Sequence, residues 1–271
     1  MQALPSERRL PTLFVPYLEG RSPGEIIPLC EAESRHVRAL RLPVDAMLRL
    51  TDGRGSDWMA TFAGDGERRR AVVLVQALVV KSPLPLELAF PVANKAHTLW
   101  LVEKMAEFAV GRLQPLEFER SRSVADAARS PSFWQKARNR ALAAVKQSGG
   151  SWLPELGDVV SVPDYLDREV DTATGLRVLL DRGGPPLATR LGDWDARSGA
   201  VLLVGPEGGL TGAEECLIER AGIQKGRLGD QVLRFETAAV AAVAIAAQRW
   251  ELTRAQAEPR PREDPRSGGV A

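Results

Sequence analysis

From Leu86 onward the chain alternates short apolar segments with segments of helical periodicity, and this pattern constrains the fold more than any other feature. The expected strands are residues 86–92, 115–119, 176–181, 200–204 and 224–228, and the expected helices are residues 97–110, 132–147, 214–221 and 237–252. Strands that alternate with helices are typical of a parallel sheet covered on both faces. We therefore expect an α/β domain at residues 86–254.

The first part of the chain follows a different pattern, in which short apolar strands are separated by turns. Residues 52–55 (Asp-Gly-Arg-Gly) are one such turn, and a single helix is expected at residues 32–40. Regularly spaced strands with turns of this kind favour a small β-barrel, here at residues 1–81. Two prolines within residues 82–85 break the pattern and indicate the domain boundary.

The composition is that of a globular protein, with 271 residues of which 44% are hydrophobic and 26% charged. No apolar run approaches the roughly 20 residues of a membrane span, and the N-terminus does not resemble a signal peptide. We interpret the chain as cytoplasmic, with no membrane partner. Cys30 and Cys216 are interpreted as two small core residues, because two distant cysteines form neither a disulfide framework nor a metal cluster. The tail at residues 257–271, with three prolines and two adjacent glycines, is expected to be disordered.

A net charge of only +1 conceals a basic middle segment. Residues 95–150 carry 10 basic and 5 acidic side chains. Such a segment suits a phosphate-binding surface or an ordinary solvated helix face, and charge alone does not decide between them.

Residues 204–211 (Val-Gly-Pro-Glu-Gly-Gly-Leu-Thr) form a loop after an expected strand. Thr211 and Glu214 have the spacing of a capping box, which predicts that a helix begins there. The glycines allow a tight turn and a close approach of the backbone to a ligand, and free N–H groups at a helix start favour acceptor atoms. The loop is neither a Walker A motif nor a dinucleotide-binding Gly-x-Gly-x-x-Gly, which argues against a nucleotidase or a classical NAD enzyme. A sharp loop without a ligand is the alternative.

Residues 228–238 (Leu-Gly-Asp-Gln-Val-Leu-Arg-Phe-Glu-Thr-Ala) form a second loop after the next strand. It contains a permanent cation, Arg234, and its Glu236 and Thr237 open a helix very rich in alanine. That helix either packs closely in a dimer interface or a threaded segment, or is simply a buried helix of good propensity. Two loops after successive strands can form two walls of one small-molecule site, so an enzyme is the leading interpretation.

The two loops resemble the signature motifs of the SPOUT class of RNA methyltransferases. More narrowly, they resemble the RsmE family, which methylates N3 of a uridine in the decoding region of 16S rRNA in the small ribosomal subunit. The matching segments are residues 36–42, 52–55, 95, 103–107, 119–121 and 147–149, together with the two loops. Ala109 replaces a glycine that is usual in this family. The resemblance implies a PUA-like β-barrel followed by a SPOUT α/β domain with a C-terminal deep trefoil knot, working as a homodimer.

The same resemblance implies direct transfer of a methyl group from S-adenosylmethionine to the uridine, without a metal, leaving S-adenosylhomocysteine. Arg234 is the candidate for stabilising the charge that develops when N3 loses its proton. Glu236 either orients Arg234 or accepts a proton, or else complements the helix dipole. His36 and His97 lack partner motifs and are interpreted as structural rather than catalytic, with RNA contact more plausible for His36.

Two further sets of residues complete the expected site. The residues expected to hold the cofactor are Leu180, Gly205, Pro206, Glu207, Gly208, Leu228, Gly229, Val232, Leu233, Thr237 and Ala238. The residues expected to contact RNA are Arg38, Arg41, Arg54, Lys95, Arg120, Arg122, Arg138 and Lys146. Phosphate contacts by such cations position an RNA without reading its sequence.

Three alternatives stay open at this point. The first is a SPOUT enzyme that acts on tRNA or large-subunit rRNA. The second is a non-catalytic RNA-binding assembly factor, which would bind RNA without binding the cofactor. The third is a metabolic enzyme with a nucleotide cofactor, for which the basic middle segment has no explanation.

Overall fold

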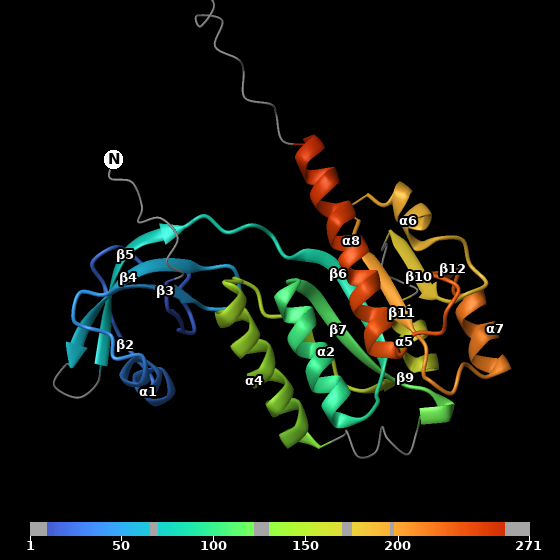
Figure 1. Ribbon diagram of the computed structural model, residues 1–271, viewed down its shortest axis with the longest axis horizontal. Helices are drawn as coiled ribbons and strands as arrows, with labels where there is room; N and C mark the ends of the chain where they lie inside the picture. The colour runs from blue at the N-terminus through green and yellow to red at the C-terminus, as the bar shows by residue number, and fades with distance from the viewer. Residues whose placement is uncertain (1–9, 66–69, 122–129, 170–174, 196–197, 258–271) are drawn as a thin grey trace, which may run out of the picture.

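The structure is a computed structural model that describes residues 10–65, 70–121, 130–169, 175–195 and 198–257. Two lobes are joined by the chain between β5 (Arg70–Leu78) and β6 (Leu84–Pro91), as Figure 1 shows. A five-stranded mixed sheet forms the first lobe, and a seven-stranded parallel sheet forms the second. The C-terminal tail from residue 258, which the sequence predicts to be disordered, lies outside the described residues.

The sheet of the first lobe has the strand order β1-β3-β4-β5-β2. Besides β5, this sheet contains β1 (Thr12–Phe14), β2 (Ile26–Pro28), β3 (Met47–Thr51) and β4 (Asp57–Asp65). β1 runs parallel to β3, whereas the other neighbouring strands are antiparallel. One helix, α1 (Glu31–Ala39), closes this core through Val37, which packs with buried leucines of the sheet.

The sheet of the second lobe has the order β12-β10-β11-β6-β7-β8, with β9 also paired to β7, and every pairing is parallel. Its further strands are β7 (Val110–Glu117), β8 (Glu155–Leu156), β9 (Val160–Ser161), β10 (Leu176–Leu180), β11 (Ala200–Val204) and β12 (Gln224–Gly226). A parallel sheet is buried on both faces. The expected α/β architecture is therefore confirmed.

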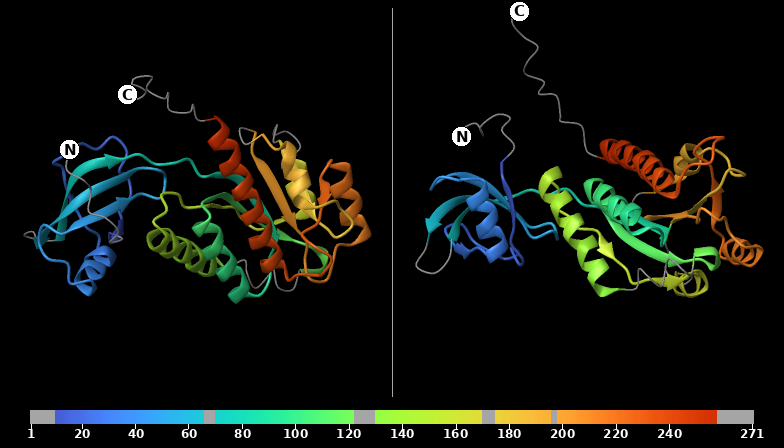
Figure 2. Two further views of the ribbon diagram at one scale, coloured as in Figure 1. Left: turned by 45° about the horizontal axis from the view of Figure 1, so that its top comes forward. Right: turned by 60° about the horizontal axis from the view of Figure 1, so that its bottom comes forward.

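Alternate side chains of β11 face opposite cores, as the period of two in a strand requires. Leu202 belongs to one apolar cluster, and Leu203 belongs to the other. Three helices cover the first cluster, namely α2 (Lys95–Glu107), α4 (Pro131–Ser148) and α8 (Phe235–Ala257). Two helices cover the second cluster, namely α5 (Val162–Glu169) and α7 (Gly212–Arg220). Figure 2 shows these helices from two further directions. Shorter helical turns are η1 (Glu119–Ser121), α6 (Leu187–Arg190) and η2 (Leu191–Asp193). Among the described residues, no helix has both the length and the apolar character needed to cross a membrane.

The expected helix at residues 97–110 differs from the structure at its end. Helix α2 ends at Glu107, and Ala109 adopts a left-handed conformation with φ 53° before β7 begins at Val110. A side chain in this conformation costs about 1–2 kcal/mol, and alanine favours helices, so local propensity gave no sign of the break. The strand predicted to begin at residue 115 therefore begins five residues earlier.

The expectation of buried cysteines is wrong, because both are free and exposed. Cys30 is the N-cap residue of α1 at the surface of the first lobe, and Cys216 lies on a solvent-facing position of α7. The usual burial of free cysteine is a tendency that the position within each helix overrides here.

The turn at residues 52–55 joins the two lobes. Gly55 N donates to Ser151 O at 3.0 Å, and Leu153 N donates to Gly53 O at 2.8 Å. A Cβ atom at Gly55 would lie 2.2 Å from the ring of Trp152, so only glycine fits. The turn that the sequence predicts as a simple strand connection is thus also a docking surface for the chain after α4.

Candidate active site

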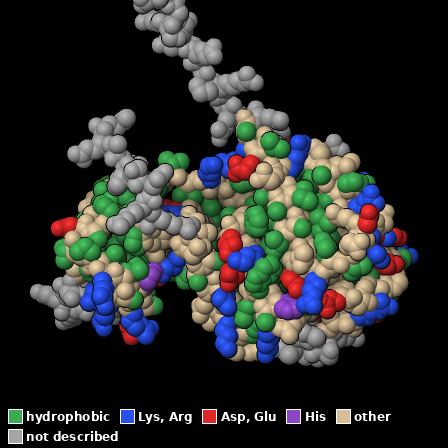
Figure 3. Space-filling view, in the orientation of Figure 1, with side chains coloured by type: hydrophobic (Ala, Val, Ile, Leu, Met, Phe, Trp, Pro, Cys, Tyr) green, Lys and Arg blue, Asp and Glu red, His purple; other side chains and the backbone are tan. Residues whose placement is uncertain are grey.

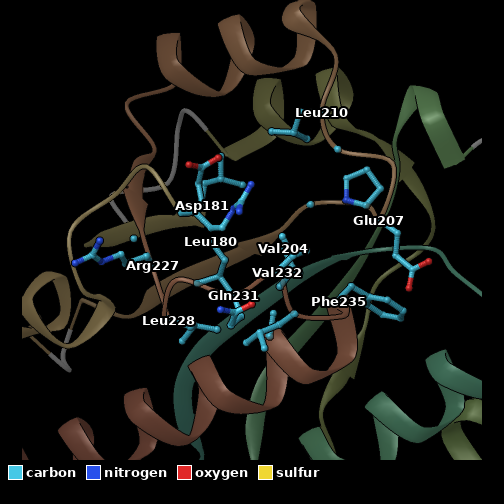
Figure 4. Close-up of a pocket in the computed structure, with 18 of the residues that line it drawn as sticks. Leu180, Asp181, Val204, Glu207, Leu210, Arg227, Leu228, Gln231, Val232 and Phe235 are labelled. Carbon is cyan, nitrogen blue, oxygen red and sulfur yellow. The ribbon is translucent and has the colours of Figure 1, made fainter.

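A cavity of about 510 Å³ opens at the carboxyl ends of the neighbouring strands β12, β10 and β11. Its walls come from three segments at residues 179–182, 204–210 and 226–233, with Glu215, Phe235 and Ala238 completing them (Figure 4). Ligands of parallel α/β sheets bind outside the carboxyl ends of the strands. The volume lies within the range of roughly 300–1,000 Å³ that is typical of small-molecule sites.

The loop after β11 has a fixed turn at its tip. Gly209 has φ +70°, and its N–H donates to Pro206 O at 2.9 Å. The loop ends in the expected capping box, in which Glu214 N donates to Thr211 Oγ1 at 3.3 Å and Thr211 N donates to Glu214 Oε2 at 2.9 Å. The helix therefore starts where the sequence predicts, directly after the cavity wall.

The segment after β10 is a wall that the sequence analysis did not identify, apart from Leu180. Gly183 N donates to Asp181 Oδ1 at 2.7 Å, which closes a tight turn. A Cβ atom at Gly184 would lie 2.5 Å from the backbone carbon of Lys225, so the loop after β10 lies directly against the backbone of β12. The available signal was the turn sequence Asp-Arg-Gly-Gly at residues 181–184, which follows an apolar strand.

Apolar and charged groups both line the cavity. Leu180, Val204, Leu228, Phe235 and Ala238 supply apolar surface, and Figure 4 shows Leu180 and Leu228 on one side of the space and Glu207 and Leu210 across it. The charged lining residues are Asp181, Arg182, Glu207, Glu215 and Arg227. Such a cavity suits a ligand with an apolar ring and a zwitterionic end. Across the described residues, no group of three or more His, Cys, Asp and Glu side chains is placed to hold a metal ion.

The structure brings most of the expected cofactor residues together around this cavity. Those that line it are Leu180, Gly205, Pro206, Glu207, Gly208, Leu228, Gly229, Val232, Leu233 and Ala238. Thr237 does not line the cavity and is exposed. Lining residues that the sequence analysis missed are Leu179, Asp181, Arg182, Val204, Gly209, Leu210, Glu215, Gly226, Arg227, Gln231 and Phe235.

The two candidate catalytic residues lie just outside the cavity lining, at the start of α8. Arg234 is exposed, and its carbonyl accepts from Ala238 N at 2.9 Å. Glu236 is mostly buried, with Oε1 3.4 Å from His97 Nδ1 on α2. Its Oε2 is buried, with no hydrogen-bond partner among the described residues. His97, which the sequence leaves without a partner, therefore contacts the candidate carboxylate.

The expected RNA-contacting residues divide into four groups. Those that are exposed and without a role in the cavity are Arg38, Arg41, Arg54, Lys95 and Arg138. Arg120 is exposed, but its Nη1 donates to Gly208 O at 2.7 Å. Lys146 is largely buried, with Nζ 2.7 Å from Glu33 Oε1, so its charge is already paired across the lobe junction. Arg122 lies outside the described residues.

The matching segment at residues 103–107 forms an ion-pair network on the surface of α2. Lys104 Nζ donates to Glu107 at 2.7 Å and to Glu103 at 3.0 Å, and Arg140 of α4 pairs with Glu103 at 3.3 Å. Glu107 and then Glu103 raise the pKa of Lys104 above its usual value. This network joins two helices and has no part in the cavity.

Comparison with known proteins identifies the family to which this chain belongs. The family described as an RNA methyltransferase domain matches residues 80–247. The ribosomal RNA small subunit methyltransferase E of Mycobacterium tuberculosis is 30% identical over 200 residues, which cover 70% of this chain and 69% of that protein. The chain belongs to the small subunit rRNA methyltransferase E family. The Synechocystis methyltransferase E is 26% identical over 208 residues, covering 76% of this chain and 67% of that protein.

Solved structures of methyltransferase E and related proteins share the fold. A crystal structure of the Neisseria gonorrhoeae methyltransferase E bound to S-adenosyl methionine has a TM-score of 0.76 and 26% identity, and covers 89% of this chain and 98% of that one. A Legionella pneumophila methyltransferase in complex with the same cofactor has a TM-score of 0.73 and 25% identity, with 89% and 98% covered. The family assignment that the two loops indicate is therefore confirmed.

Proposed function

We propose that this protein transfers a methyl group from S-adenosylmethionine to N3 of a uridine in the decoding region of 16S rRNA in the small ribosomal subunit. The observation that carries the proposal is the cavity at the carboxyl ends of β12, β10 and β11, which both family loops line. The Neisseria relative with the same fold binds this cofactor.

The lining residues fit S-adenosylmethionine. Leu180, Leu228 and Ala238 offer apolar surface for the adenine ring, while the loop at residues 205–209 offers backbone groups at close range. Side chains of both signs, such as Asp181 and Arg227, suit the amino-acid end of the cofactor. The cavity is lined by mixed polar and apolar groups, as specific small-molecule sites are.

The residues outside the cavity are suited to the chemistry at the uracil. The bound cofactor supplies a methyl carbon, to which N3 forms a bond while the carbon–sulfur bond breaks and S-adenosylhomocysteine leaves. The guanidinium group of Arg234 stabilises the negative charge on the uracil oxygens once N3 has lost its proton. Arg234 is exposed and lies outside the cavity lining, so it is accessible to an RNA base while the cofactor occupies the cavity. Placing N3 against the methyl carbon supplies further acceleration.

In this proposal Glu236 takes part in the reaction together with Arg234, and His97 positions the Glu236 side chain. The Glu236 side chain is mostly buried, so its rotamer depends on the contact between its Oε1 and His97. Its buried Oε2 has no hydrogen-bond partner among the described residues, and in this proposal it gains a hydrogen bond or a proton when the uridine is bound. In this proposal His97 is a positioning residue for Glu236.

We expect His97→Ala to lower kcat about tenfold, since the lost contact is of the order of one charge-assisted hydrogen bond. The KM for S-adenosylmethionine should stay within about twofold of wild type, because His97 does not line the cavity. His97→Gln restores a donor and should recover much of kcat. Steady-state kinetics of all three proteins test this, and a wild-type kcat for His97→Ala would exclude the role.

In this proposal basic side chains on both lobes contact the phosphates of the RNA. Figure 3 shows Lys and Arg side chains near α1 in the first lobe and near the lower ends of α4 and α2 in the second. The first lobe acts in this proposal as a PUA-like β-barrel that presents Arg38, Arg41 and Arg54 to phosphates. Folded RNA is recognised by its shape and by a base splayed out of the stack. The phosphate contacts of these arginines therefore position the RNA without reading its sequence.

The C-terminal segment forms, in this proposal, a deep trefoil knot. β12 lies at the edge of the sheet, yet α8 packs on β11 and β6, which lie further inside. Residues 227–234 therefore cross the carboxyl ends of the strands beside the loop after β10, and Leu187 N donates to Arg227 O at 2.8 Å there. Stretching a single molecule by its two ends tests the knot. A knotted chain stays shorter than a fully extended chain of 271 residues, and a full-length extension would contradict it.

The protein acts as a homodimer in this proposal. Four large apolar side chains are 38% or more exposed, namely Trp100, Val232, Leu233 and Leu252. Figure 3 shows hydrophobic side chains gathered over α8 and α2. Exposed apolar patches of this kind mark interaction sites. Light scattering should give twice the 29.5 kDa of one chain, and the mass of a single chain would contradict the dimer.

Calorimetric titration of S-adenosylmethionine into the purified full chain tests the proposed cofactor directly. We expect binding in the micromolar range, as is ordinary for a small cofactor site. Naked 16S rRNA is titrated in parallel. Binding of RNA without any binding of S-adenosylmethionine would overturn the proposal in favour of a non-catalytic RNA-binding factor.

A further inference from the structure

Glu214 is a buried carboxylate that does more than cap α7. The residue is only 3% exposed. Its Oε2 accepts from Thr211 N, as in an ordinary capping box, but its Oε1 accepts from Glu119 N at 2.8 Å. Glu119 belongs to η1, the turn that follows β7. The carboxylate therefore ties η1 to the start of α7.

Arg120, the next residue of η1, reaches the other end of the same loop. Its Nη1 donates to Gly208 O at 2.7 Å. Its Cβ and Cδ lie 3.4 Å and 3.6 Å from the place that a Cβ atom of Gly208 would occupy, so the side chain lies along the loop. Among the ion pairs found within the described part of the chain, none involves Arg120. The carbonyl of Gly208 is its observed partner.

The contact with Arg120 fixes one particular peptide unit of the cavity wall. The peptide that joins Gly208 to Gly209 accepts at its oxygen from Arg120 and donates from its N–H to Pro206 O at 2.9 Å. Both ends of this peptide are therefore engaged, although glycine is the most flexible residue. The neighbouring residues 205–208 line the cavity, so the orientation of their backbone groups depends on this peptide.

We propose that Arg120 and Glu214 are positioning residues that hold the cofactor loop at residues 205–211 against η1. Arg120 contributes to cofactor affinity through Gly208, and not to the RNA surface to which its charge and its sequence context assign it. A preformed loop spares the ordering cost that binding would otherwise include. This inference rests on the proposed binding of S-adenosylmethionine.

The test compares four full-length proteins: wild type, Arg120→Met, Arg120→Lys and Arg220→Met. Methionine keeps much of the apolar stem of Arg120 but donates no hydrogen bond, whereas lysine keeps a charged donor. Arg220 is an exposed arginine at the end of α7 that does not line the cavity, and so serves as the matched control. Each protein is titrated with S-adenosylmethionine and with naked 16S rRNA, and its kcat and KM values and thermal midpoint are measured.

We expect Arg120→Met to raise the Kd and KM for S-adenosylmethionine about tenfold, because the variant loses one charge-assisted hydrogen bond. The kcat, thermal midpoint and RNA affinity of Arg120→Met should match those of wild type. Arg120→Lys should recover most of the cofactor affinity. The control Arg220→Met should behave as wild type in every measurement. Unchanged cofactor affinity with weakened RNA binding in Arg120→Met would overturn the inference and return Arg120 to the RNA surface. Wild-type protein that binds no S-adenosylmethionine would instead overturn the proposed function, and this inference with it.

Glu214→Gln provides an independent variant. Glutamine has one acceptor oxygen, and its amide nitrogen only donates, so one of the two contacts from Thr211 N and Glu119 N is lost. Hydrogen exchange of the backbone amides at residues 207–211 should become faster in this variant and in Arg120→Met, without a change in the core strands. Unchanged exchange in both variants would contradict the positioning role.

Discussion

Arg234→Ala is expected to lower kcat for methyl transfer by about 10²–10³-fold, the usual cost of removing one group that stabilises developing charge. The affinity for S-adenosylmethionine should stay close to wild type, because Arg234 is exposed and does not line the cavity. The chemical reason is that N3 of uracil carries a proton at neutral pH, and the cation favours the anion that forms when it leaves. Single-turnover kinetics with saturating cofactor and RNA measure the effect on the chemical step alone.

Arg234→Lys serves as the matched variant, since it keeps the charge but not the planar guanidinium. We expect its rate to lie between those of wild type and Arg234→Ala. A wild-type single-turnover rate in Arg234→Ala would remove Arg234 from the mechanism. A loss of cofactor binding in Arg234→Ala would move it into the cofactor site instead.

Gly208→Trp is expected to weaken S-adenosylmethionine binding at least about hundredfold, which corresponds to about 2.7 kcal/mol. Gly208 lines the cavity, and a Cβ atom there already lies 3.4 Å from the Arg120 side chain. An indole ring must therefore either enter the cavity or displace Arg120 and the loop. Calorimetric titration measures the loss.

Gly212→Trp is the control for that substitution. Gly212 lies in the first turn of α7, close to the same loop, but a Cβ atom there meets no atom within 4 Å and the residue does not line the cavity. Its cofactor affinity should equal that of wild type. Equal binding by wild type and Gly208→Trp would show that S-adenosylmethionine binds elsewhere.

The parts of the site that the sequence predicts are those set by local chemistry. The capping box of Thr211 and Glu214 needs only a spacing of three residues, and it is present in the structure. The two loops follow apolar strands whose alternation with helices already indicates a parallel sheet, so their convergence at one edge follows from topology. Only Thr237 among the expected cofactor residues lies off the cavity, since it faces outward on the first turn of α8.

The parts that could not be predicted depend on contacts between distant segments. Charge and sequence context assigned Lys146 and Arg120 to RNA, whereas their observed partners, Glu33 and Gly208, lie 113 and 88 positions away in the sequence. The wall after β10 depends on the close backbone approach of Gly184 to Lys225, which no local pattern shows. The contact between His97 and Glu236 is likewise a product of the packing of α2 against α8.

The most direct test of the central claim is to map the methyl group on RNA. Purified protein is incubated with S-adenosylmethionine carrying a deuterated methyl group and with small ribosomal subunits that lack the modification. The 16S rRNA is then digested and its fragments are analysed by mass spectrometry. We predict labelled N3-methyluridine at a single position in the decoding region, formed about 10²–10³-fold more slowly with Arg234→Ala. Labelled RNA without N3-methyluridine, or the absence of label in 16S rRNA, would contradict the account.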